Sequence, residues 1–147
     1  MLAEVRYPGG EVIYHNYDAR GAQTQALKTG IPDQAWECDA AGRAIHSRQG
    51  DANLYYHYDE AGLRTALALE LDEVTYWTHY EQEERGLLSA LCDPWEQATY
   101  YAYDPRGLQL TRRLPNQVTS YYNYDDAGQV QSLLHAGTGG LLQSLYY

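Results

Sequence analysis

Tyr103-Asp104-Pro105-Arg106-Gly107 is one copy of a five-residue pattern, Tyr-Asp-x-x-Gly, that returns along the whole chain. Four further copies, one of them with cysteine in place of tyrosine, are Tyr17–Gly21, Cys38–Gly42, Tyr58–Gly62 and Tyr124–Gly128. A degenerate copy runs from Tyr80-Glu81 to Gly86. The glycines at positions 21, 42, 62, 86, 107 and 128 are 21, 20, 24, 21 and 21 residues apart. A nearly fixed period of this length is typical of a repeat architecture.

The Asp-x-x-Gly part of the pattern predicts a tight turn between two strands. Aspartate is favoured at the first position of a type I turn, because its carboxylate accepts hydrogen bonds from backbone N–H groups that follow. Glycine at the fourth position adopts the left-handed conformation that completes a hairpin with a bulge. We therefore predict a structural turn role for one set of residues: Asp18, Gly21, Asp39, Gly42, Asp59, Gly62, Gly86, Asp104, Gly107, Asp125 and Gly128.

Between consecutive glycines lie two strand-like segments and a second, more variable turn. After Gly107 the chain runs through Leu108–Leu114, a turn signal at Pro115–Gln117, and Val118–Tyr124. The predicted fold class is therefore all-β: about six antiparallel β-hairpin repeats in a continuous, twisted and curled sheet. We place the extra residues of the 24-residue period partly in a charged turn at 81–85.

The predicted domain is the single range 1–147. We interpret this range as a segment of a longer array, because the pattern shows no polar capping repeat at either end. Its edge strands are expected to pair with neighbouring repeats or to self-associate.

Aromatic residues fall in rows when they are counted back from each glycine. Residues four and six positions before the glycine share one face, because side chains alternate along a strand. The row at six positions contains Trp36, Tyr56, Tyr101 and Tyr122. A third row, at seven positions, lies on the opposite face beside polar residues and contains Tyr14, Tyr55, Tyr100 and Tyr121.

Two interpretations of these rows stay open at this point. The favoured one is ladder packing, because the rows recur in every repeat and a binding site need not. The other is a stacking surface for carbohydrate or a partner protein, formed by the row that begins with Trp36. The strand after each glycine gives no clean face assignment, and we suggest a bulge at the glycine as the cause.

Composition narrows the partners further. The net charge is −10 and no basic stripe exists, which disfavours nucleic acid and anionic membrane surfaces. The sequence contains no apolar run long enough for a membrane span and no signal peptide. With 16 tyrosines, 3 tryptophans and no phenylalanine, the sheet faces are expected to be amphipathic.

The sequence predicts no enzyme and no cofactor. Most aspartates are accounted for as turn formers, so a pair of catalytic carboxylates is disfavoured. The five histidines show no metal-ligand spacing. Two cysteines do not form a disulfide framework. We expect Cys38 to be a small buried hydrophobe, with a bridge to Cys92 or a reactive thiol as alternatives.

The repeated pattern resembles the rearrangement-hotspot (RHS) repeat, also called the YD repeat. The resemblance covers essentially the whole chain in about six consecutive units, and Tyr-Tyr-x-Tyr-Asp occurs in three of them. In bacterial polymorphic toxins and insecticidal toxin complexes of this family, long arrays form a hollow β-shell around a toxic C-terminal domain. Teneurins carry a similar shell on the cell surface, and some members have been proposed to bind carbohydrate.

The resemblance implies a structural shell segment that helps to encapsulate or present a toxin or other effector domain, within a secreted or cell-surface protein. The chain is too short to close around a cargo and shows no toxin domain. Asp104–Leu108 is similar to the Asp-Pro-x-Gly-Leu that ends the core of such toxins. Because it lies in register inside the array, we interpret it as an ordinary turn and carry over no self-cleavage aspartates.

Overall fold

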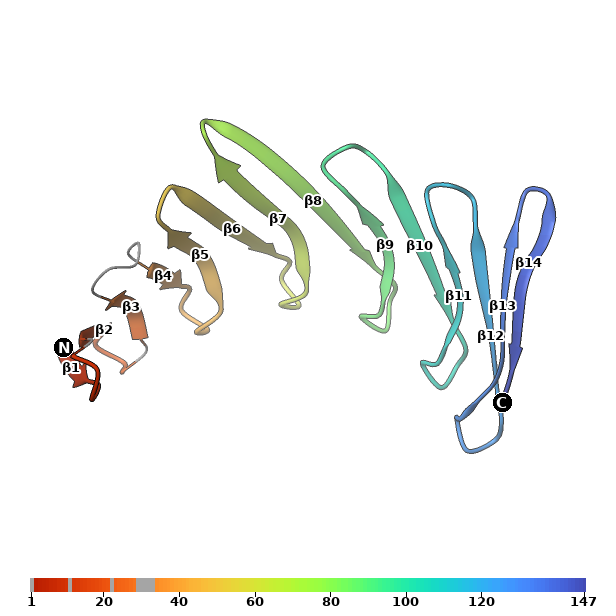
Figure 1. The fold of residues 1–147 in the computed structure, drawn as a ribbon, viewed down its shortest axis with the longest axis horizontal. Coiled ribbons are helices and arrows are strands. Elements are labelled where there is room, and N and C mark those ends of the chain that lie inside the picture. Colours follow the sequence, from red (N-terminus) through yellow and green to blue (C-terminus); the bar gives the residue numbers. More distant parts are fainter. Residues whose placement is uncertain (1, 11, 22, 29–33) are drawn as a thin grey trace. The chain divides into compact units, whose positions relative to one another are not determined.

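The computed structural model describes residues 2–10, 12–21, 23–28 and 34–147, and over these residues the chain forms β-strands and no helix. The expected all-β class of antiparallel hairpins is confirmed. The chain divides into two compact units, Met1–Trp77 and Thr78–Tyr147. Within each unit every strand lies beside the strands that precede and follow it in sequence (Figure 1). A simple meander is what short connections between sequential strands favour.

The first unit contains seven strands among its described residues: β1 (Leu2–Arg6), β2 (Val12–Tyr17), β3 (Gln23–Lys28), β4 (Gln34–Cys38), β5 (Ala44–Gln49), β6 (Ala52–Tyr58) and β7 (Arg64–Leu71). Strand β8 (Val74–Gln82) contains the boundary between the units. The second unit continues with β9 (Leu88–Cys92), β10 (Ala98–Tyr103), β11 (Gln109–Arg113), β12 (Thr119–Tyr124), β13 (Val130–Gly137) and β14 (Gly140–Tyr146).

A β-bulge recurs in the strand that follows each repeat glycine. Ala102 pairs with Thr111 and Tyr103 pairs with Gln109, so Leu110 has no partner across the ladder. The same shift occurs in the other five repeats, always at the third residue after the glycine. The expected bulge therefore exists, but it lies three residues beyond the glycine. Because it exchanges the two faces of the strand, it explains why this strand shows no clean alternation in the sequence.

The longer period between Gly62 and Gly86 arises from the strands and not from a charged turn. Strands β7 and β8 have 8 and 9 residues and are joined by a two-residue turn at Asp72-Glu73. Both turn residues have positive φ, 51° and 63°, as the tight type I′ hairpin turn requires. The turn at 83–86 has the same length as those of the other repeats, so placing the insertion there was wrong. In the repeat that ends at Gly42, the sequence predicts the variable turn at the breaker cluster 30–33, which lies outside the described residues.

The sheet has little buried core. Among the described residues the buried apolar side chains are three alanines, Ala66, Ala68 and Ala90, whereas the tyrosines and leucines are half-buried or exposed. A single layer cannot cover its large side chains, because burial normally needs a second packed layer. Its stability must therefore come largely from strand ladders and from side-chain contacts along the turns.

Candidate functional site

The Asp-x-x-Gly turn is the best-defined local structure in the chain. In the fourth complete copy, the Gly107 N–H donates to the Asp104 carbonyl at 3.0 Å, and the Asp104 N–H donates to the Leu108 carbonyl at 2.9 Å. The Asp104 carboxylate oxygen Oδ1 accepts from the Arg106 and Leu108 N–H groups at 2.8 and 2.9 Å. Gly107 has a φ of +86°, which is the left-handed conformation that glycine adopts without strain.

The other predicted turn residues lie in equivalent positions. Each repeat glycine has a positive φ and donates to the carbonyl at the first turn position, which belongs to Asp18, Asp39, Asp59, Glu83 or Asp125. The degenerate copy is therefore centred on Gln82-Glu83 and not on Tyr80-Glu81. A glutamate stands here for the aspartate, in the same register relative to Gly86.

Arginine side chains connect one turn to the next. Arg106 binds its own Asp104 through Nε at 2.8 Å, and its Nη1 donates to the Asp125 carbonyl at 3.2 Å. Arg85 pairs with Glu83 at 2.6 Å and donates to the Asp104 carbonyl at 2.8 Å. Arg20 makes equivalent bonds to the carbonyls of Asp39 and Ala40. We call these side chains arginine staples, and they fix the spacing of consecutive turns.

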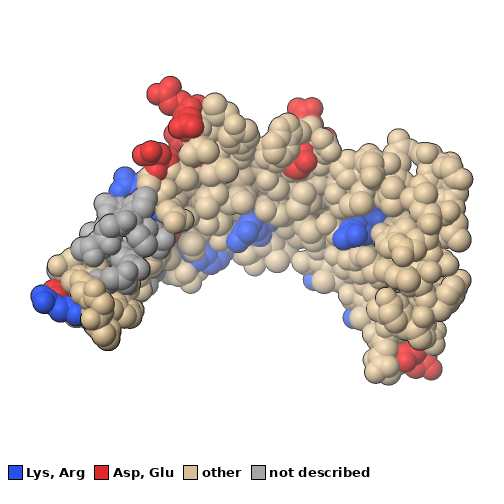
Figure 2. All heavy atoms as spheres, in the orientation of Figure 1, with Lys and Arg blue, Asp and Glu red and all other residues tan. Residues whose placement is uncertain are grey.

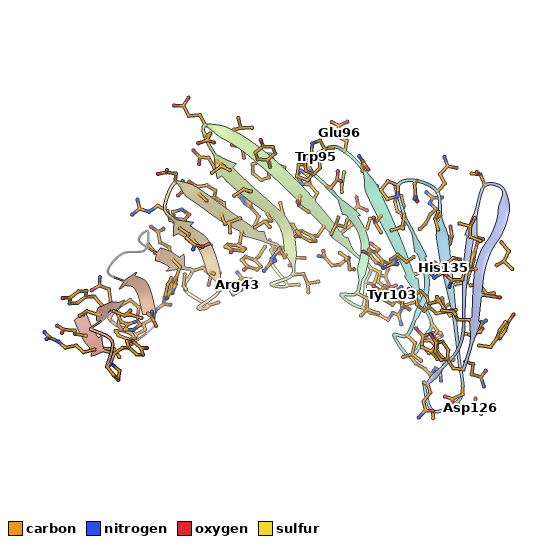
Figure 3. The ribbon with its side chains drawn as sticks, viewed as in Figure 1. Arg43, Trp95, Glu96, Tyr103, Asp126 and His135 are labelled. Carbon is orange, nitrogen blue, oxygen red and sulfur yellow. The ribbon has the colours of Figure 1, made fainter. Side chains whose placement is uncertain are left out.

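In three repeats the tyrosine of the motif closes the open end of a hairpin. The β11–β12 ladder begins at Thr111, so the Gln109 carbonyl lies beyond the last pair, and the Tyr124 hydroxyl donates to it at 2.9 Å. The same bond, also at 2.9 Å, joins Tyr103 to the Leu88 carbonyl and Tyr58 to the Ala44 carbonyl. Phenylalanine has no hydroxyl and cannot make this tyrosine clasp. Figure 3 shows Tyr103 at the turn end of β10.

Two ionisable groups of this network have shifted pKa values with clear causes. Burial acts to raise the pKa of Asp104, but hydrogen bonds from the Leu108 N–H and the Arg106 side chain outweigh it and hold the pKa below its usual value. Burial raises the pKa of both Tyr103 and Tyr124. The folded state therefore favours the aspartate charged and the clasp tyrosines neutral.

The aromatic row proposed for stacking is partly covered. Trp36, Tyr56, Tyr101 and Tyr122 are all half-buried. The Arg64 guanidinium lies 5.2 Å from the Tyr56 ring centroid, and the Tyr56 hydroxyl lies 3.2 Å from the Ser47 hydroxyl. Apart from Tyr146 and Tyr147 at the last strand, the most open tyrosines of the second unit are Tyr100 and Tyr121, which are 45% and 44% exposed. Both belong to the row at seven positions. The alternation of side chains along a strand places Tyr100 and Tyr121 on the same face of the sheet, but it does not predict which face is exposed.

The remaining chemical groups do not assemble a reactive centre. Ser120 Oγ lies 2.9 Å from His135 Nδ1, but Ser120 is 1% exposed and cannot meet a substrate. Within the described ranges no group of three His, Cys, Asp or Glu residues could hold a metal ion. Cys38 and Cys92 are free and half-buried. In the part of the chain that the structure describes, no helix is long and apolar enough to cross a membrane.

Charge is distributed unevenly over the second unit. Figure 2 shows acidic side chains at the ends of its hairpins and basic side chains on the strands between them. The acidic ends coincide with turn positions such as Glu96 and Asp126, which Figure 3 places at opposite ends of the hairpins. In these turns the carboxylates that accept backbone N–H groups are those of Asp93 and Asp125.

Comparison with solved structures matches nearly the whole chain. A mutant Photorhabdus luminescens Tc holotoxin pore contains a segment that superposes with a TM-score of 0.82 over 99% of this chain, at 16% sequence identity. The chain has the YD-repeat fold. The matched YD-repeat segment is 9% of that toxin chain. At this identity the similarity establishes the fold alone.

Two other structures match with lower scores. TcdB2-TccC3-TEV and TcdB2-TccC3-Cdc42 give TM-scores of 0.42 and 0.28 at 11% and 10% identity. Each match covers 99% of this chain, and the matched segments are 11% and 14% of the two matched chains, respectively. No protein-family model matches the sequence, and neither does any curated protein.

Proposed function

We propose that this YD-repeat chain is a structural segment of a β-shell that helps to encapsulate or present an effector domain. One observation carries the proposal: the side chains that define the repeat are used to bind neighbouring backbone. The clasp tyrosines, the turn aspartates and the staple arginines all have partners inside the sheet. Residues that are used in this way hold the sheet together. Because they have this structural role, we propose no enzymatic role for the chain.

The fold comparison supports a role inside a larger polypeptide. The matched segment is a small part of a Tc toxin chain. By this likeness we propose that the chain works within a larger secreted or cell-surface protein, next to further repeats, and that residues 1–147 act as one repeat domain.

The last strand offers a surface for such a neighbour. Strand β14 pairs with β13 along one edge, and all its residues are exposed, with Leu141 and Leu142 at 65% and 62%. Exposed apolar edge strands readily pair with another strand. We propose that a neighbouring repeat, or a second copy of this chain, pairs with β14.

Sedimentation analysis of the chain tests this pairing. We expect concentration-dependent self-association that the double variant Leu142→Lys/Ser144→Pro weakens, because a charge and a proline both block edge pairing. The control is Thr138→Lys in the preceding turn. A chain that stays monomeric at high concentration, or a control that weakens association equally, would contradict the pairing.

Protease protection tests the shell role directly. A protease site is inserted into an effector domain that is fused through flanking YD repeats to this segment. The site should resist cleavage in the intact protein and become cleavable when Tyr58, Tyr103 and Tyr124 are all changed to phenylalanine. Cleavage of the intact protein as fast as that of the isolated effector domain would refute the shell role.

The alternative of carbohydrate binding through Trp36, Tyr56, Tyr101 and Tyr122 stays a prediction. The half-buried state of that row gives it no added support.

A further inference from the structure

The exposed face of the second unit carries a trough that the repeat ladders do not use. Two cavities of about 600 and 540 Å³ share two lining residues, Tyr100 and Arg113. The larger extends between the two hairpin tips, where Glu96 and Gln117 line it. The smaller extends over the middle of β10, β11 and β12 to Tyr121. Because both cavities contain the same pair, they form one continuous trough.

Arg113 is the chemically distinctive group in the trough. Its guanidinium lies over the Tyr100 ring, 4.8 Å from the ring centroid. The other turn-facing arginines of this unit, Arg85 and Arg106, are already paired with carboxylates. Arg113 is exposed and has no carboxylate within ion-pair distance among the described residues. A guanidinium over a ring keeps its N–H donors available for a carboxylate, which accepts them in a two-pronged geometry.

Tyr121 supplies an apolar surface at a defined distance from this cation. Arg113 is opposite Thr119 in the β11–β12 ladder, and Tyr121 lies two residues further along β12 on the same face. Both Tyr100 and Tyr121 are nearly half exposed. In an extended peptide, side chains two residues apart share a face and are separated by about 6.6–6.8 Å. Along the strand direction, the offset between Arg113 and Tyr121 therefore equals the side-chain repeat of an extended ligand, while across the ladder the two positions are diagonal neighbours about 7–8 Å apart.

We propose that this trough binds an extended acidic segment of another polypeptide. A carboxylate of the segment pairs with Arg113, and an aromatic or large apolar side chain two residues away packs on Tyr121. Local charge complementarity selects this occupant, because Arg113 is an exposed cation with no carboxylate within ion-pair distance among the described residues. Glu96 at the hairpin tip disfavours a second carboxylate at that end of the trough. The site does not depend on a shell role for the chain.

Fluorescence anisotropy with the whole chain tests the site. The probe is a labelled, capped peptide with the sequence Gly-Ser-Glu-Gly-Tyr-Ser-Gly. Arg113→Gln should weaken its binding about tenfold or more, as the loss of a charge-assisted hydrogen bond implies. Glu96→Gln should strengthen binding by removing a repulsive charge. Arg112→Gln is the matched control, because Arg112 is adjacent in sequence and lies on the opposite face.

The probe itself supplies further controls. Replacing its glutamate by glutamine, or inserting a second glycine between glutamate and tyrosine, should each reduce affinity. Circular dichroism of each variant checks that the fold is retained. Arg113→Lys should bind the probe with intermediate affinity, because lysine keeps the positive charge but lacks the planar pair of N–H donors of the guanidinium. Absence of measurable probe binding would overturn the proposal. So would equal losses for Arg112→Gln and Arg113→Gln, or binding of oligogalacturonate as tight as that of the peptide.

Discussion

Changing Tyr124 to phenylalanine removes one oxygen atom and with it the clasp at the open end of the β11–β12 hairpin. The hydroxyl donates to the Gln109 carbonyl at 2.9 Å, beyond the last backbone pair of that ladder. A net intramolecular hydrogen bond contributes about 1 kcal/mol, with a range of roughly 0.5–1.5 kcal/mol. We therefore expect Tyr124→Phe to lower the free energy of unfolding by about 1 kcal/mol. In a unit of this size the melting temperature should fall by about 4–8 °C.

Tyr122→Phe is the matched control. Tyr122 lies two residues earlier on the same strand, is similarly half-buried and makes no hydrogen bond through its hydroxyl in the described part of the chain. Its loss of a hydroxyl should change stability by no more than about 0.5 kcal/mol, as for a surface substitution. Urea unfolding followed by circular dichroism measures both variants. Equal effects of the two changes would refute the clasp.

The clasp also predicts a dependence on alkaline pH. Burial raises the pKa of Tyr103 and Tyr124 in the folded chain. Unfolded tyrosine ionises near pH 10, so above about that pH the unfolded state loses its protons first and folding stability falls. Below that pH the contribution is fully present. The double phenylalanine variant should lose less stability between about pH 9 and 11 than the unmodified chain, and parallel pH profiles would contradict this.

Three further predictions concern the turns of the same unit. Gln117 has a φ of +64°, a conformation that costs a non-glycine residue about 1 kcal/mol, so Gln117→Gly should raise the urea midpoint of unfolding. Gly107 has a φ of +86°, so Gly107→Ala should lower that midpoint. A shift in the same direction for both would count against a backbone origin. Arg85→Lys should destabilise by about 0.5–1 kcal/mol in urea unfolding, because lysine cannot bind Glu83 and the Asp104 carbonyl as a planar fork; an unchanged midpoint would exclude the staple. The pKa of Asp104 is lowered in the folded chain, so the stabilisation from its charged form is present above about pH 4 and is lost as the pH falls below that value. Asp104→Asn should therefore make folding stability depend less on pH in the acid range. An unchanged acid profile would argue against a contribution from Asp104.

The turns could be predicted from the sequence because their cause is local. An aspartate that accepts nearby N–H groups and a glycine with positive φ determine the backbone within five residues, whatever surrounds them. The sequential order of the hairpins in the sheet followed from the regular spacing of the repeat glycines alone. The turn at Asp72-Glu73 escaped prediction, because neither residue is the glycine or asparagine that this turn type prefers.

The bulge position could not be predicted, because no residue type marks it. The unpaired residue is Thr24, Ile45, Thr65, Ser89, Leu110 or Gln131 in successive repeats. The bulge is set by the pairing of two strands on either side of the turn and not by a local preference. The exposure within the aromatic row at seven positions was missed for a related reason. Alternation separates the two faces, but the exposure of Tyr100 and Tyr121 depends on which side chains surround them.

The clasp tyrosine and its acceptor carbonyl lie in the same stretch between consecutive glycines. Tyr124 and Gln109 both fall between Gly107 and Gly128, and Tyr103 and Leu88 both fall between Gly86 and Gly107. A gene rearrangement that inserts, deletes or exchanges a stretch from one glycine to the next keeps every clasp with its acceptor. A break between the tyrosine and its acceptor separates the two. Repeat number can therefore change by whole units of about 21 residues without loss of the clasps.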